Sequence, residues 1–208
     1  MLKKTGQILA VTFLEAAMLP ALAGQLENCT ATSKARLTIR VWDRSHIDSR
    51  TLARAQVVTN SAFNAVGLDI HWIHCGEEQT PENLPCQSPL GGPYDLSLRI
   101  IRLSKASRKD WRSVACGSAT GSSVVYIFYD RLETLLNRSP RVTSPDLALG
   151  VTMAHEIGHL LLPPGHALKG IMRARLEPED WKLAEVGCLT FCSQEAEQIM
   201  RRVGTCNQ

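Results

Sequence analysis

Two histidines and a glutamate are the residues of this 208-residue chain whose types and spacing best suit chemistry. His155, Glu156 and His159 form the pattern His-Glu-x-x-His. Residues four apart lie on one face of an α-helix, so the imidazoles of His155 and His159 would lie side by side. Two imidazoles so placed can bind one Zn²⁺, and Glu156 beside them can act as general base on a zinc-bound water.

A catalytic zinc site takes three protein ligands and keeps a fourth position for water, so this pattern requires one more donor. His166 is the nearest candidate. The Pro-Pro-Gly sequence at 163–165 should end the helix and turn the chain, which would let His166 fold back toward the other two histidines.

The helix that carries these residues has its own start signal. Ser144 can cap it, Pro145 suits the first helical position, and Asp146 complements the helix dipole. From there to Leu162 the sequence is apolar except for the His-Glu-His face, which predicts a helix buried on most sides. Burial of histidine and glutamate side chains costs free energy unless their polar atoms have bonding partners, and metal binding would provide such partners.

The rest of the chain predicts a mixture of strands and helices, and therefore an α+β fold in one domain. Alternating or continuous apolar runs predict strands at 36–42, 68–75, 94–103, 113–120 and 124–129. Helical periodicity and capping residues predict helices at 49–66, 131–137, 178–187 and 193–203, and residues 76–93 should form a loop. Ser49 is the expected cap of the first helix, and Gly67 follows its end.

Residues 1–23 are typical of a secretory signal peptide. Two lysines at positions 3 and 4 precede a mostly apolar run, and Ala21-Leu22-Ala23 is a small-x-small cleavage site before Gly24. The mature protein would then be a single domain at 24–208, secreted or periplasmic. No other segment is long and apolar enough to cross a membrane.

The seven cysteines all follow the predicted cleavage site. In an exported protein they indicate a disulfide framework with one thiol left over. Cys75 and Cys86 bracket the 76–93 loop and would staple it. Cys206 could pair with either Cys188 or Cys192. Both pairings stay open, because disulfide connectivity does not follow from sequence.

The charge of the mature chain argues against nucleic acid as a partner. Removal of residues 1–23 leaves 21 basic and 19 acidic residues, a formal net charge of +2, and the basic residues are not clustered. We expect a monomer whose partner is a peptide or protein substrate.

These motifs resemble those of the zincin metallopeptidases, and of the metzincin-like group in particular, including small exported bacterial zincins. The resemblance implies a twisted mixed sheet of four to five strands with a backing helix, a buried active-site helix and C-terminal helices. It also implies that Gly170-Ile171-Met172 is the methionine turn, with Met172 as an apolar base beneath the metal. Arg173 stands where metzincins often carry a tyrosine and could assist the oxyanion.

The chain departs from the metzincin pattern after the second histidine. Leu162 occupies the position of the family's glycine, and His166 lies seven rather than six residues after His159. A glutamate from the following helix, as in gluzincins, is therefore an alternative third ligand, and Glu179 or Glu185 would serve.

The resemblance implies a zinc-dependent endopeptidase in which Glu156 is the general base. The substrate would lie extended along an exposed sheet edge at 113–120 by main-chain pairing. Two alternatives remain open: a zincin-fold protein that binds zinc without turnover, and a disulfide-stabilised structural domain in which the histidine pattern is accidental.

Overall fold

A computed structural model describes residues 35–76, 84–91, 94–103, 116–121, 123–138 and 144–204. The predicted signal peptide, Cys29 and Cys206 lie outside the described residues.

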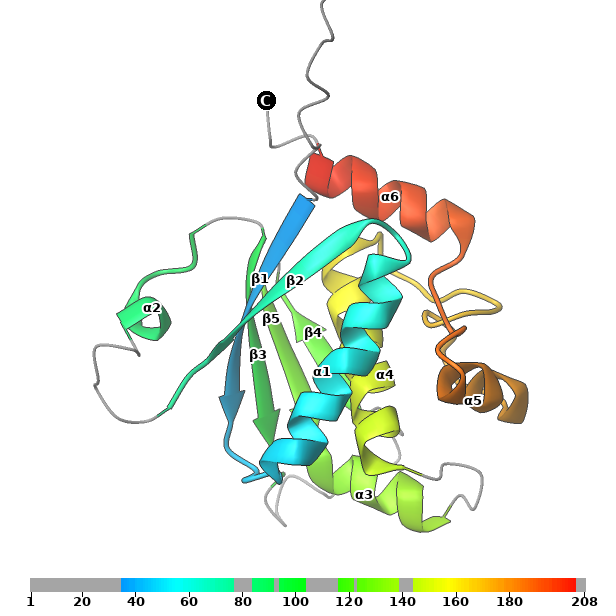
Figure 1. The fold of residues 1–208 in the computed structure, drawn as a ribbon, viewed down its shortest axis with the longest axis horizontal. Coiled ribbons are helices and arrows are strands. Elements are labelled where there is room, and N and C mark those ends of the chain that lie inside the picture. Colours follow the sequence, from blue (N-terminus) through cyan, green and yellow to red (C-terminus); the bar gives the residue numbers. More distant parts are fainter. Residues whose placement is uncertain are drawn as a thin grey trace, which may run out of the picture. The chain divides into compact units, whose positions relative to one another are not determined.

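The centre of the fold is a five-stranded mixed sheet with the strand order β2-β1-β3-β5-β4 (Figure 1). Its strands are β1 (Ala35–Asp43), β2 (Leu68–His74), β3 (Asp95–Ile101), β4 (Gly117–Thr120) and β5 (Val124–Phe128). The first four in spatial order are parallel, and β4 pairs with β5 antiparallel at one edge. The prediction of an α+β fold with a mixed sheet is confirmed. Of the segment predicted at a sheet edge, 113–120, residues 117–120 form the edge strand β4, and residues 113–115 lie outside the described residues.

One face of the sheet forms the main core. Every second residue of the inner strands is buried, as the pleat requires. These residues are Leu37, Ile39 and Val41 of β1, Leu96, Leu98 and Ile100 of β3, and Val125 and Ile127 of β5. They join one apolar cluster with residues of α1 (Ser49–Asn64) and α4 (Pro145–Leu161), and Figure 1 shows these two helices side by side across the sheet.

The ends of α1 differ slightly from the prediction. The cap is Asp48 rather than Ser49, because the Asp48 carboxylate accepts the backbone N–H of Thr51 at 3.0 Å. Aspartate accepts this bond as well as serine does, so the start moves by one residue. Gly67 follows the end of the helix with φ of 83°, a left-handed conformation that glycine adopts without steric cost.

The predicted start of α4 is confirmed. Ser144 accepts the backbone N–H of Leu147 at 3.4 Å, and Pro145 occupies the first turn. Leu149, Met153 and Ile157 are fully buried along the helix. This burial fixes the position of α4 against the core, and with it the histidine and glutamate side chains on the remaining face.

The loop predicted at 76–93 contains a short helix, α2 (Leu84–Gln87), which the sequence analysis missed. A single helical turn is too short to show periodicity, and tertiary constraints hold it instead. Cys86 is buried and forms the predicted disulfide with Cys75. Disulfides persist in oxidising compartments, which agrees with an extracytoplasmic setting.

The remaining helices surround α4: α3 (Tyr129–Arg138), α5 (Pro178–Glu185) and α6 (Ser193–Gly204). All three were predicted within a few residues. Cys188 and Cys192, which lie in the connection from α5 to α6, carry free thiols, and their predicted partner Cys206 lies outside the described residues. Among the helices described, none combines the length and apolar character needed to cross a membrane.

Candidate metal centre

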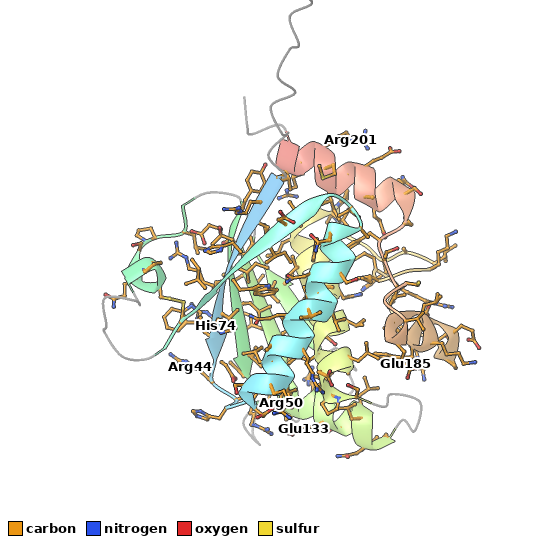
Figure 2. All side chains as sticks on the ribbon, in the orientation of Figure 1. Arg44, Arg50, His74, Glu133, Glu185 and Arg201 are labelled. Carbon is orange, nitrogen blue, oxygen red and sulfur yellow. A yellow bond between two sulfur atoms is a disulfide. The ribbon has the colours of Figure 1, made fainter. Side chains whose placement is uncertain are left out.

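Three histidines meet at the exposed side of α4. His155 and His159 come from consecutive turns of that helix, and His166 comes from the loop that follows it. One nitrogen of each lies within 4.8 Å of the others, and this is the only such cluster among the described residues. The alternative third ligands, Glu179 and Glu185, do not join it; Figure 2 shows Glu185 on α5.

The predicted Pro-Pro-Gly bend brings His166 back to α4. Leu162 leaves the helix with extended backbone, although its N–H still donates to the carbonyl of Gly158 at 2.9 Å. Gly165 then adopts φ of 137°, which favours glycine. Beyond it, the N–H of Ala167 donates to the carbonyl of Met172 at 2.9 Å, so residues 167–172 form a closed turn beside the histidines.

This turn orients His155. Its Nδ1 lies 2.7 Å from the carbonyl oxygen of Ile171. A carbonyl oxygen can only accept, so Nδ1 carries the hydrogen and the lone pair of the neutral ring is on Nε2. That Nε2 lies 3.1 Å from Nε2 of His159, and the two rings therefore aim their metal-binding atoms at a common point.

The protonation state of the cluster also suits a metal. Burial lowers the pKa of His155, and burial together with the nearby His155 and His166 lowers the pKa of His159 to about 4. Both rings are thus neutral near pH 7, and the neutral imidazole is the form that binds metal. Three nitrogen donors beside an open cleft fit a metal with a vacant coordination position.

Met172 packs directly against α4 at Gly158. It is 2% exposed. A Cβ placed on Gly158 would lie 2.4 Å from the Met172 sulfur and 3.0 Å from the Phe191 ring. Only glycine therefore allows this approach, and the methionine sulfur lies against α4 at the residue before His159. Its role as an apolar base beneath a metal stays a prediction.

Glu156 lies beside the histidines with its carboxyl group largely out of water. Its exposed fraction is 7%, and burial raises its pKa to about 7. A Cβ on Gly117, the first residue of β4, would lie 2.5 Å from its Cγ, so the strand backbone passes directly over this side chain. No described residue donates a hydrogen bond to the carboxylate, which leaves it available to a ligand in the cleft.

Arg173 is engaged by the start of α5. Its Nη1 lies 3.0 Å from Oδ2 of Asp180, and the same oxygen accepts the N–H of Glu177 at 2.7 Å. The arginine borders the cleft, but its guanidinium holds the 167–172 turn to α5, and an oxyanion role stays a prediction. Asp180 was not singled out from the sequence, although its place two residues after Pro178 marks it as a capping residue.

The site opens into a cleft of about 1070 Å³. Its walls are β4, the exposed side of α4, the end of α3 and the segment that follows Met172. All three histidines and Glu156 face it. In comparisons with known proteins, no family model and no curated protein matches the chain. Function is therefore inferred from the chemistry of this site.

Proposed function

We propose that the protein is an exported zinc-dependent endopeptidase of the zincin type, similar to the metzincins. The observation that carries the proposal is a buried carboxyl group, Glu156, next to a cluster of three histidines in an open cleft. A binding site for metal alone would have no use for a costly buried carboxyl group there. The order of strands and helices around α4 and the methionine packed against Gly158 support the family assignment.

His155, His159 and His166 would hold the zinc. The chemistry that zinc supplies in such a site is Lewis-acid polarisation of a carbonyl and activation of a water. The Ile171 carbonyl fixes the ring of His155, and the apolar packing of Met172 holds the helix and the turn together. These contacts keep the three donors in place when substrate enters or leaves.

Glu156 would act as the general base. As the water oxygen attacks the scissile carbonyl carbon, its proton passes to the Glu156 carboxylate. When the C–N bond breaks, the same proton passes to the leaving amine nitrogen. Burial raises the pKa of this carboxyl group to about 7 in the metal-free protein, which favours proton uptake by a general base near neutral pH.

The edge strand β4 offers a place for the peptide chain. Its antiparallel pairing with β5 leaves its other edge without a neighbouring strand in the sheet order. An extended substrate could pair with that edge through main-chain hydrogen bonds, directly above Glu156. The Cys75–Cys86 disulfide and the predicted signal peptide at 1–23 support a secreted or periplasmic location.

The test compares wild type with Glu156→Gln in a peptide-cleavage assay with and without chelator, alongside zinc analysis of both proteins. We expect stoichiometric zinc in both and a loss of hydrolysis of about 10²-fold to 10⁴-fold in the variant. Glu179→Gln is the matched control, because Glu179 is exposed on α5 outside the cluster.

Two results would contradict the proposal. Wild-type activity in Glu156→Gln would show that this residue is not the base. Stoichiometric zinc without cleavage of any peptide would favour the alternative, a non-catalytic zinc-binding protein, and absence of zinc would exclude both.

A further inference from the structure

The cleft beside the histidines carries more positive than negative charge. Three arginines border it, Arg138, Arg173 and Arg175, together with the carboxylates of Glu156 and Glu177. Some of these charges are already paired with other side chains of the protein.

Arg173 is neutralised. Its guanidinium contacts Asp180 at 3.0 Å and Glu177 at 3.9 Å. The Glu177 carboxylate is therefore directed toward Arg173, and the Glu156 side chain is 7% exposed beneath the backbone of β4 and makes no ion pair within the described residues. Neither acid is left to balance the other two arginines.

Arg138 and Arg175 have no counter-charge among the residues that the structure describes. Both are exposed at the cleft, and within the described part of the chain neither makes an ion pair or a hydrogen bond. They come from different walls: Arg138 ends α3, whereas Arg175 follows the 167–172 turn. A concave site lined by one sign of charge strengthens the local field and attracts ligands of the opposite sign.

On this basis we propose that Arg138 and Arg175 bind carboxylates of the peptide substrate, and so make the enzyme selective for acidic peptides. The inference rests on the proposed function, and it names the substrate class of the same site. The arginine guanidinium suits this role because it can donate two parallel hydrogen bonds to one carboxylate. Both arginines are specificity-determining residues in this scheme, and neither takes part in bond breaking.

A peptide carboxylate has two sources, an Asp or Glu side chain and the free C-terminus. The experiment therefore uses three matched fluorogenic peptides: an amidated peptide with Glu residues on both sides of the scissile bond, its Gln analogue, and the Gln analogue with a free C-terminus. The readout is the ratio of kcat/KM for each carboxylate peptide to that for the amidated Gln peptide.

For wild type we expect a ratio of about tenfold to a hundredfold, the effect of a charge-assisted hydrogen bond. A preference for the Glu peptide identifies side chains as the source, and a preference for the free C-terminus identifies the terminal carboxylate. Arg175→Ala and Arg138→Ala should each lower the ratio toward one. Arg175→Glu should instead favour a fourth matched peptide, in which Lys replaces each Glu, a reversal that loss of folding cannot produce.

Arg50→Ala is the matched control, because Arg50 is an exposed arginine on α1 that does not border the cleft (Figure 2). This variant should keep the wild-type ratio. A wild-type ratio near one, with chelator-sensitive cleavage of all three peptides, would overturn the inference and leave the proposed function standing. Absence of chelator-sensitive cleavage of every peptide would overturn the proposed function, and the inference with it.

Discussion

Glu156 links the chemistry of the site to the stability of the protein. Its pKa is raised from 4.5 to about 7 by burial. Between these values the folded metal-free protein retains a proton that the unfolded chain has lost, so burial of this residue lowers stability as the pH rises from about 4.5 to about 7. The penalty is complete above that range.

We therefore expect the metal-free Glu156→Gln variant to become more stable than metal-free wild type across this pH range. The difference in free energy of unfolding should grow to about 3 kcal/mol above pH 7 and stay constant beyond it. Urea unfolding of both proteins in chelator, at a series of pH values, measures it. A difference independent of pH would show that Glu156 has an ordinary pKa in the folded protein.

Gly158 is a second residue at which a small change should have a defined effect. Alanine normally stabilises a helix relative to glycine by about 1 kcal/mol. Here the added methyl group would meet the Met172 sulfur at 2.4 Å. We expect Gly158→Ala to lower the free energy of unfolding by about 1–3 kcal/mol and to weaken zinc binding, because the turn that orients His155 must move.

A double variant tests whether the contact with Met172 causes the loss of stability in Gly158→Ala. In Gly158→Ala/Met172→Ala the contact is relieved, so the loss of stability should be smaller than the sum of the two single losses. Denaturant unfolding of the four proteins measures this coupling. Additive losses would show that Gly158 and Met172 do not interact.

At the scale of elements, the start of α5 is bonded to Arg173, which follows the turn that orients His155. Asp180 is 6% exposed and receives hydrogen bonds from Arg173 and from the Glu177 backbone. Arg173 follows the turn whose Ile171 carbonyl orients His155. Asp180 is thus a positioning residue that acts on the site through two intermediate contacts.

We expect Asp180→Ala to lower the free energy of unfolding by about 2 kcal/mol, since it removes a helix cap and leaves a partly buried arginine without its partner. Zinc affinity should fall as well, because the turn is released. Chemical unfolding and a zinc-competition titration measure the two effects. Glu179→Ala, the neighbouring exposed acid, should change neither; equal effects of both variants would assign the loss to the helix dipole alone.

The elements that could be predicted are those with local signals. Ser144 and Pro145 predict the start of α4, and the Pro-Pro-Gly sequence at 163–165 predicts its end. The cluster of His155, His159 and His166 could therefore be predicted from one continuous segment. The short helix α2 has no such signal, because a disulfide and tertiary packing hold it. Asp48 replaced Ser49 as a cap because adjacent residues can make the same hydrogen bond.

At the scale of the whole molecule, the cleft could not be predicted, because its walls are distant in sequence. Arg138 and Arg175 are 37 positions apart by their numbers and meet the cluster only through the packing of α3 and the 167–172 turn around α4. The strand order is likewise non-sequential, with β1 between β2 and β3. Hydrophobic periodicity identifies strands but does not specify their neighbours.

The disulfide lies next to β2, the edge strand opposite β4. Cys75 follows β2, and Cys86 lies in α2. The segment after α2 is held to the sheet by Arg40, whose guanidinium donates to the Ser88 and Pro89 carbonyls. Neither cysteine borders the cleft, so the disulfide and the metal centre should contribute to the protein separately.

Replacement of both cysteines by serine tests this separation. Because the bridge closes a loop with a sequence separation of 11, we expect the double variant to lose about 3 kcal/mol of unfolding free energy. Its zinc content and its rate of peptide cleavage should stay at the wild-type level below the unfolding transition. Cys188→Ser, at an exposed free thiol, is the control and should leave stability unchanged. Loss of zinc from the folded double variant would show instead that β2 and α2 help to hold the metal centre in place.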